Sequence, residues 1–241
     1  MKKGVKKMGK KYFIFCVAII VMLGIVYSNA LAEEGFIKEQ GIVDKAHATF
    51  HSFMADENMT WIHENLNNIK GIVIIPEILK GGFIIGGSGG TGVLFVRDEE
   101  TGTWSQPAFY TIGSLSVGLQ IGAEKAEILM AVKTQKGIES FYKTTFRLGG
   151  DVSLAAGPGG AGAKTNITAD IVSFAKTKGA FAGASLEGAV VKTNYDANKN
   201  YYGQSVQPVD IIVKHEVSNP GSEKLREALK KASAPEKDKE D

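Results

Sequence analysis

Residues 71–122 decide the fold of this chain: GIVIIPEILKGGFIIGGSGGTGVLFVRDEETGTWSQPAFYTIGSLSVGLQIG. This stretch holds 12 of the chain's 29 glycines, interleaved with isoleucine, valine, leucine and phenylalanine. From Leu115 onward apolar and small residues alternate strictly, which is typical of a half-buried strand. Glycines inside strands mark bulges, sharp bends or the close approach of another backbone. We therefore expect a strongly bent sheet with a face of small side chains, which suits a large flat partner better than a deep catalytic cleft.

Helices are predicted on both sides of this stretch. An apolar stripe predicts an amphipathic helix over residues 36–56, and a shorter helix is expected at about 59–68 with Asn58 as its N-cap. Thr134 is expected to cap a short mid-chain helix, and Ser222 a C-terminal helix.

The remaining apolar runs predict further strands. Residues 127–132 (EILMAV) form a continuous apolar run, which predicts a central strand. Residues 98–102 have hairpin-turn chemistry between strands at 92–97 and 103–111, in which Pro107 marks an edge or a bulge. Alternation also predicts strands at 151–156, 170–176 and 180–191. The expected fold class is α+β: a glycine-rich, mainly antiparallel sheet, bent or barrel-like, with N-terminal helices, one mid-chain helix and a C-terminal helix.

Residues 1–32 have the pattern of a secretory signal peptide. Six lysines precede an apolar run at 12–26, and Ala30-Leu31-Ala32 follows as a cleavage site. The run is shorter than the ~20 residues of a membrane-spanning helix, and Cys16 lies in its middle, where lipid attachment is disfavoured. We expect cleavage near Ala32 and a periplasmic or extracellular protein, with one domain at 33–220 and a terminal helix and charged tail at 221–241.

Loss of this leader changes the charge of the chain. The whole sequence has 28 basic and 26 acidic residues, and all six leader lysines are lost, which leaves 22 basic residues and a formal charge of −4. This balance excludes a global basic field for nucleic acid. The only cysteine is also lost, which excludes disulfides, thiolate nucleophiles and cysteine-ligated zinc.

Two catalytic motifs are matched in form within the glycine-rich stretch. Residues 87–92 fit the dinucleotide pattern G-x-G-x-x-G, and residues 86–90 fit the G-x-S-x-G elbow of serine hydrolases with Ser88 as nucleophile. Asp210 and His215 follow in the order of a hydrolase triad. Both motifs require a helix immediately afterwards, whereas residues 93–96 (VLFV) predict a strand. A turn in a bent sheet is the favoured interpretation.

Two further patterns suggest ligand sites. Residues 157–165 (GPGGAGAKT) approach the phosphate-loop pattern, but one extra residue separates the last glycine from the lysine. His47 and His51 are spaced i, i+4 on the first predicted helix, as in a zinc site, but no cysteine or strong third ligand is near. Two partly buried histidines in a helix seam are the favoured interpretation, so neither a metal nor a cofactor is predicted.

Several spaced segments together resemble the SYLF-domain family. They cover about residues 40–205 and read, in order, 70–76 (KGIVIIP), 80–87 (KGGFIIGG), 90–94 (GTGVL), 104–109 (WSQPAF), 116–122 (SVGLQIG) and 149–158 (GGDVSLAAGP). The resemblance implies lipid binding without an established enzymatic activity. Eukaryotic members bind phosphoinositide membranes, yeast members also bind actin, and bacterial relatives are mostly exported. Because this chain shows a bacterial-type leader and no SH3 or FYVE segment, we expect actin not to be a partner.

The expected function is that of an exported lipid- or membrane-surface-binding protein without catalysis. The candidate lipid contacts are Phe36, Lys38 and Phe50 on the first helix and a basic patch of Lys80, Arg97, Lys133, Lys136 and Lys143. The alternative for the helix, which we favour, is that it packs on the sheet and the lysines are solvated. Two other functions remain open. One is a structural envelope protein that forms homo-oligomers through its sheet edges, and the other is a hydrolase that uses Ser88.

Overall fold

A nine-stranded sheet forms the centre of the fold, in the order β5-β9-β3-β2-β1-β4-β7-β6, with β8 paired to β7. The computed structural model describes residues 33–82, 85–117, 124–160, 167–177, 180–181 and 186–234. The strands are β1 (Gly71–Gly82), β2 (Ile85–Val96), β3 (Ala108–Val117), β4 (Glu124–Val132), β5 (Thr145–Arg147), β6 (Leu154–Ala156), β7 (Ile171–Thr177), β8 (Ala180–Phe181) and β9 (Val190–Thr193). Only β6 and β7 pair in parallel among the described strands, so the expected mainly antiparallel α+β fold is confirmed.

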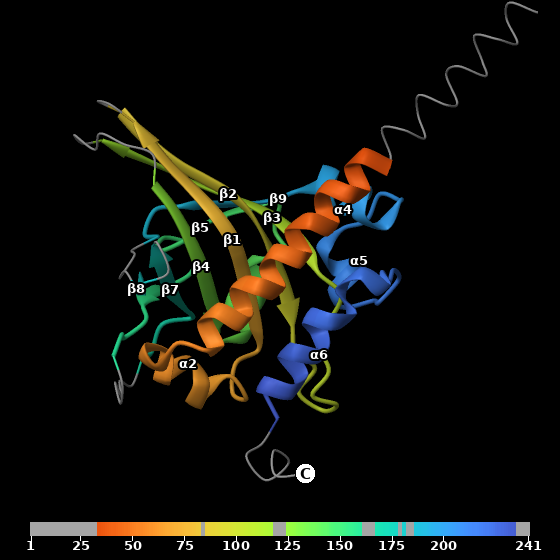
Figure 1. Cartoon of the computed structure of the whole chain (residues 1–241). Helices are drawn as coiled ribbons and strands as arrows, with labels where there is room; N and C mark the ends of the chain where they lie inside the picture. Colours follow the sequence, from red (N-terminus) through yellow and green to blue (C-terminus); the bar gives the residue numbers. More distant parts are fainter. Residues whose placement is uncertain are drawn as a thin grey trace, which may run out of the picture.

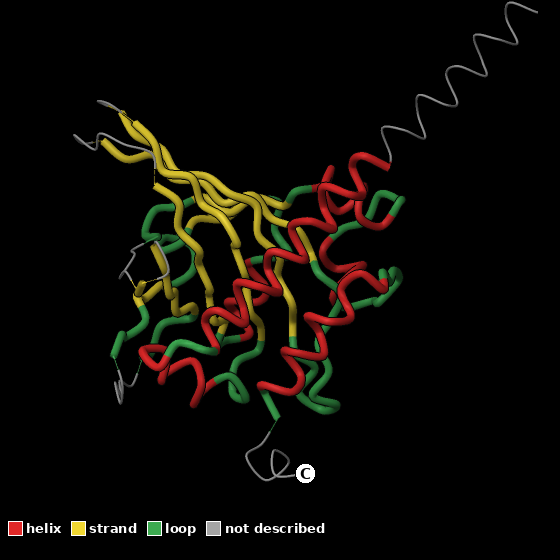
Figure 2. The backbone as a smooth tube through the Cα atoms, in the orientation of Figure 1, coloured by secondary structure: helices red, strands yellow, loops and turns green. Residues whose placement is uncertain are grey.

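A long N-terminal helix over residues 33–54 crosses one face of the sheet, and α6 lies on the same side (Figures 1 and 2). The other helical elements are η1 (Glu57–Met59), α2 (Thr60–Asn65), α3 (Gln135–Ser140), α4 (Tyr195–Tyr202), α5 (Pro208–Ile212), η2 (Pro220–Ser222) and α6 (Glu223–Ala232). In the described part of the chain, none of the helices has the length and apolarity needed to span a membrane.

The central strands are buried on both faces. In β1, Ile72 and Ile74 belong to one apolar cluster and Val73 and Ile75 to the other. The first cluster is covered by the N-terminal helix, α2 and α6, and the second by α3, α5 and the surrounding loops. Because both faces of these strands exclude water, their sequences are continuous apolar runs rather than alternating apolar and polar residues. The predicted central strand at 127–132 is confirmed as part of β4, between β1 and β7.

The bend of the sheet comes from a bulge in β1. Its register with β2 shifts between Ile74 and Leu79, and its register with β4 shifts between Ile75 and Ile78. The bulged backbone presses against β2, where a Cβ on Gly90 would lie 2.3 Å from the Glu77 carbonyl oxygen. Glycine is therefore required at this position, as the sequence predicts for glycines inside a bent strand.

Beyond the bulge, the ends of β1, β2 and β3 project past the helices (Figure 1). Two glycines here have room for a side chain: a Cβ on Gly89 would meet its nearest atom at 3.8 Å, and one on Gly113 at 3.5 Å. Leu79 is paired with Gly89 and is 51% exposed. The strict alternation expected from Leu115 runs out of the described residues after Val117.

Several predicted boundaries differ from the observed ones. The second hairpin strand begins at Ala108 rather than at 103, because Pro107 cannot donate to the ladder. Asp56, not Asn58, caps the helical segment that begins at Glu57. Thr134 caps α3 as expected, by accepting a hydrogen bond from the Gly137 amide.

Two further differences lie in the C-terminal half. Ser222 stands before α6 but makes no capping bond, because its hydroxyl donates to the buried Gln106 side chain instead. Within the strand expected at 180–191, residues 182–185 lie outside the described residues, residues 180–181 form β8, residues 186–189 are not in a strand, and β9 begins at Val190. Leu186 lies between β8 and β9 and joins the core.

Candidate functional site: a basic groove beside α5 and α6

A groove of about 590 Å³ lies where α5, α6 and the connection between β2 and β3 meet. Its volume falls within the range of small-ligand sites. Its lining comes from five separate parts of the chain: Val96, Arg97, Asp98, Thr103, Trp104, Ser105, Gln106, Tyr142, Ile212, Val213, His215, Val217, Ser218 and Arg226. Two of the chain's three arginines are among these residues.

Both arginines are held in place by backbone carbonyls. Arg97 follows β2 directly and donates through Nη1 to the Asn67 carbonyl at 2.9 Å. Its Nε is buried and has no hydrogen-bond partner. Arg226 is on α6 and donates through Nε to the Trp104 carbonyl at 2.9 Å. A guanidinium carries five N–H donors, so each arginine keeps donors for an anionic ligand.

His215 lies in the loop after α5 and has a left-handed backbone with φ of 54°. This conformation is uncommon outside glycine, costs free energy and is found at ligand sites more often than elsewhere. Asp98 is the one carboxylate of the lining. Hydrogen bonds from the Thr101 and Glu100 amides, together with the charge of His215, hold the pKa of Asp98 below its ordinary value. Asp98 therefore stays ionised and offsets only part of the positive charge.

The groove also has an apolar side. Trp104 and Ile212 are buried in its wall, and Val213 stands 53% exposed at its margin. The indole nitrogen of Trp104 donates to the Ser233 hydroxyl at 3.2 Å, which fixes the ring. A ligand that carries both an anionic group and an apolar part has contacts for each in this groove.

Arg97 is the only predicted lipid-contacting residue in the groove lining. Lys133 is half-buried, with its ammonium group bonded to the Ile167 carbonyl and 5.8 Å from the centre of the Trp61 ring. Lys136 forms an ion pair with Asp170 at 3.5 Å, and Lys143 is exposed. The side chain of Lys80 lies outside the described part of the structure. Of the residues in the expected basic patch, Arg97 alone lines the groove.

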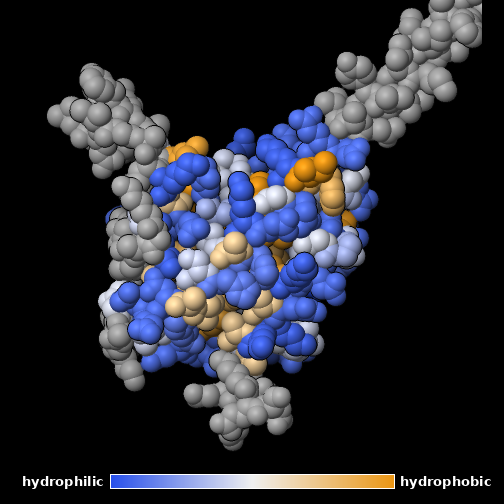
Figure 3. Space-filling view, viewed as in Figure 1, coloured by the Kyte–Doolittle hydropathy of each residue, from blue (hydrophilic) through white to orange (hydrophobic). Residues whose placement is uncertain are grey.

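The residues of the N-terminal helix that were considered as lipid contacts differ in their exposure. Phe50 is buried in the core at 1% exposure and has no surface to offer a membrane. Phe36 is 39% and Ile37 63% exposed, and hydrophobic surface is visible near the start of the helix in Figure 3. Lys38 is exposed beside them. The packing of this helix on the sheet, which the sequence favours, is thus confirmed for most of its length.

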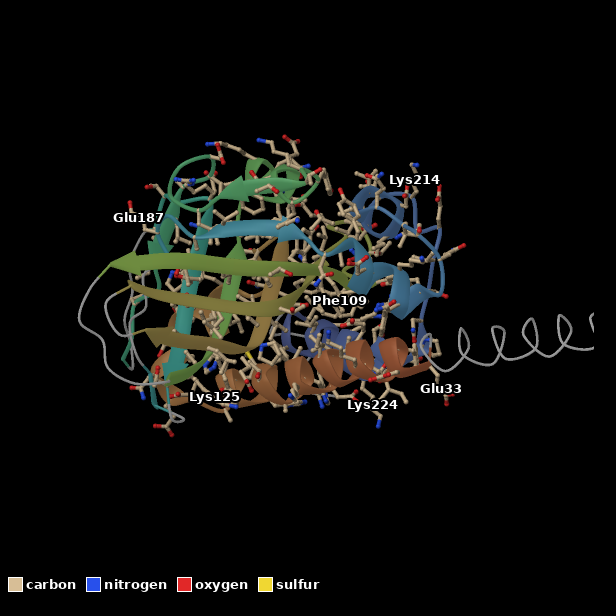
Figure 4. The ribbon with its side chains drawn as sticks, turned by 90° about the horizontal axis from the view of Figure 1, so that it is seen from above. Glu33, Phe109, Lys125, Glu187, Lys214 and Lys224 are labelled. Carbon is tan, nitrogen blue, oxygen red and sulfur yellow. The ribbon has the colours of Figure 1, made fainter. Side chains whose placement is uncertain are left out.

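Exposed lysines are spread over the molecule. Figure 4 shows Lys125 and Lys224 on the side of the N-terminal helix and Lys214 on the opposite side. Sequence reasoning missed Arg226 and His215 as groove residues. The arginine lies among lysines on a helix, and the histidine stands alone in a loop, so neither carries a local signal.

The catalytic candidates are not assembled around Ser88. Its hydroxyl lies 2.7 Å from the Ser114 hydroxyl on β3, and a second hydroxyl is not a general base. Residues 87–92 belong to strand β2 rather than to the expected turn, and no helix follows them. Asp210 bonds to Lys214, while His215 lines the groove.

The family model and the related proteins that match this chain point to the same family. The profile of the Ysc84 family, described as "Las17-binding protein actin regulator", matches residues 113–232. An SH3 domain-containing protein of Schizosaccharomyces pombe is 39% identical over 144 residues. LAS seventeen-binding protein 3 of Saccharomyces cerevisiae is 35% identical over 147 residues, and human SH3 domain-containing YSC84-like protein 1 is 31% identical over 148.

These matches cover 57–59% of this chain but only 32–43% of each relative, so the chain spans well under half the length of those proteins. The resemblance to the SYLF family is confirmed. The expectation that actin is not a partner is wrong, because the family description names actin regulation.

Proposed function

The chain contains a Ysc84/SYLF-type domain, and from this premise we propose that it is a non-catalytic binding protein whose groove takes the anionic headgroup of a lipid surface. The observation that carries the proposal is that two guanidinium groups, those of Arg97 and Arg226, line one groove. Each keeps N–H donors beyond the one bonded to a backbone carbonyl, and such a donor binds an anionic oxygen with a charge-assisted bond.

The apolar contacts of the proposed surface come from two places. Val213 stands at the groove margin, and Phe36 and Ile37 are exposed at the start of the N-terminal helix. Apolar side chains next to basic ones are typical of proteins that bind at the headgroup level of a bilayer.

Vesicle flotation tests the proposal. We expect the protein to float with vesicles that contain phosphatidylserine and much less with pure phosphatidylcholine. A basic residue near an anionic surface contributes about 1 kcal/mol, so replacing both groove arginines (Arg97→Gln with Arg226→Gln) should weaken binding roughly 30-fold. The matched control is Arg147→Gln, because Arg147 is exposed and outside the groove. Equal flotation of the double variant and the wild type rules out the groove, and no flotation with either vesicle rules out the function.

The proposed setting is the periplasm or the cell exterior. It rests on the leader pattern at residues 1–32. N-terminal sequencing of the protein from a secreting host should begin at Glu33. A mature protein that still begins at Met1 contradicts this setting.

A second candidate is binding to actin or to a protein that regulates actin assembly. It is favoured by the names of the family and of the yeast relative, whose matched segment lies within this domain. Co-sedimentation with actin filaments tests it. We expect the wild type to pellet with filaments if this function is shared, and protein that stays entirely in the supernatant at micromolar filament concentrations excludes it.

A further inference from the structure

His47 and His51 form a pair on the surface of the N-terminal helix. Their Nε2 atoms are 3.0 Å apart, and the rings meet edge-on with centroids 4.6 Å apart and an interplanar angle of 81°. His51 is exposed and His47 is half-buried, so the pair is open to solvent rather than closed in a helix seam. Neither residue lines the basic groove.

The separation of the two nitrogens is that of neighbouring ligands on one metal ion. Imidazole nitrogens bind zinc and similar ions at about 2.0–2.1 Å, which puts two adjacent ligands roughly 2.9–3.4 Å apart for angles between square and tetrahedral. In the structure the same two atoms are within hydrogen-bond distance of each other. An ion bound to both lies to one side of the line between them, so each ring turns to point its lone pair at the ion while the nitrogen separation is kept.

We propose that His47 and His51 chelate one divalent transition-metal ion, with Cu²⁺ held most tightly. Imidazole suits copper, nickel and zinc, and among the divalent first-row ions the affinity of a nitrogen site is greatest for Cu²⁺. Among the described residues, no group of three or more histidine, cysteine or acidic side chains is placed to hold a metal ion. Water therefore completes the coordination, and the site keeps open positions.

Two charged side chains act on His47: Lys224, which is basic, and Asp44, which is acidic. Neutral imidazole is the form that binds metal. Asp44 lies one turn before His47, and its carboxylate is held by Gln40 at 2.9 Å. It supplies negative charge close to the ion and partly offsets Lys224.

Isothermal titration of the full chain with Cu²⁺ tests the proposal, with Cys16 alkylated in every sample so that its thiol does not compete. We expect one site in the wild type. His51→Ala should weaken it by at least about tenfold, because the second imidazole binds as an intramolecular ligand. His51 is exposed, so this variant should keep its fold, and circular dichroism confirms that. His63→Ala is the matched control and should leave binding unchanged.

Electron paramagnetic resonance gives a second readout. The wild-type complex should show hyperfine coupling to two imidazole nitrogens, and His51→Ala should show coupling to no more than one. Equal Cu²⁺ affinity of the wild type and His51→Ala overturns the proposal, and so does a two-nitrogen signal that persists in that variant. The result does not depend on lipid or actin binding.

Discussion

The ammonium group of Lys176 on β7 lies 2.9 Å from the carboxylate of Asp56, with side chains only 5% and 14% exposed. It also donates to the carbonyl oxygen and the hydroxyl of Ser52, at 3.0 and 3.2 Å. Ser52 is in the last turn of the N-terminal helix and Asp56 follows that helix. One buried cation therefore fastens the end of the helix to the sheet.

Removing one partner of this pair should destabilise the fold strongly. Asp56→Asn leaves the ammonium group of Lys176 buried without its counter-charge, which costs about 3–5 kcal/mol for a buried pair. Urea denaturation measures the change. Lys214→Met breaks an exposed pair with Asp210 and should cost less than about 1 kcal/mol. Equal costs for the two variants contradict this interpretation.

Asp170 should stabilise the protein at neutral pH and not in acid. Burial alone raises its pKa, but hydrogen bonds from Ser153 and Thr134 outweigh burial and lower the pKa to about 2. A lowered folded-state pKa gives stability that is present above the ordinary value of 3.8 and is lost as the pH falls through about 2.

The variant Asp170→Asn should therefore lose roughly 2 kcal/mol of unfolding free energy at pH 7. The loss should shrink steadily below pH 4. Asp196→Asn, at an exposed position, is the control and should show little change at either pH. A cost of Asp170→Asn that is the same at pH 7 and pH 2.5 argues against the assignment.

The effect of Glu39 on folding stability should have the opposite dependence on pH. It is 3% exposed on the N-terminal helix, and its Oε2 has no hydrogen-bond partner. Burial raises its pKa, and a hydrogen bond from Asn200 only partly compensates. A raised folded-state pKa gives stability that is present below the ordinary value of 4.5 and is lost as the pH rises through the folded value.

Glu39→Gln removes this charge and should raise the melting temperature at pH 7. The gain should vanish below pH 4, where the wild-type carboxyl is protonated in both states. Glu34→Gln changes an exposed glutamate of the same helix and serves as the comparison. A gain of equal size at both pH values shows that the effect is not ionisation.

The bulge predicts a contrast between two adjacent glycines of β2. Gly90→Ala places a Cβ against the Glu77 carbonyl, which should cost about 1–3 kcal/mol through overpacking. Gly89→Ala meets nothing closer than 3.8 Å and should leave stability unchanged or raise it by up to about 1 kcal/mol. Chemical denaturation of both variants checks the contrast, and similar losses contradict it.

Local sequence patterns predicted the sheet well because they reflect burial directly. The apolar runs at 72–75 and 128–132 are strands covered on both faces, and the glycines at 90 and 92 do accommodate a bulge. The parallel pairing of β6 with β7 left no such sign, since alternation in a strand does not specify its partner.

Sequence patterns did not predict most of the residues that line the groove. Arg97 was singled out for its charge, but Arg226 and His215 join it only when distant segments come together. Phe50 and Lys133 were predicted as lipid contacts from the sequence. The fold instead buries Phe50 in the core and engages the ammonium group of Lys133 in a hydrogen bond to a backbone carbonyl.

The last elements of the chain close over the first. Gln40 of the N-terminal helix donates to the Gly221 carbonyl, the Trp104 indole reaches Ser233, and Leu225 joins the cluster under that helix. During synthesis these contacts form only after residue 233 has left the ribosome. Until then the part of this face that α6 covers stays exposed, so completion of the core is a late event. The unfinished chain must be kept from aggregating while it waits.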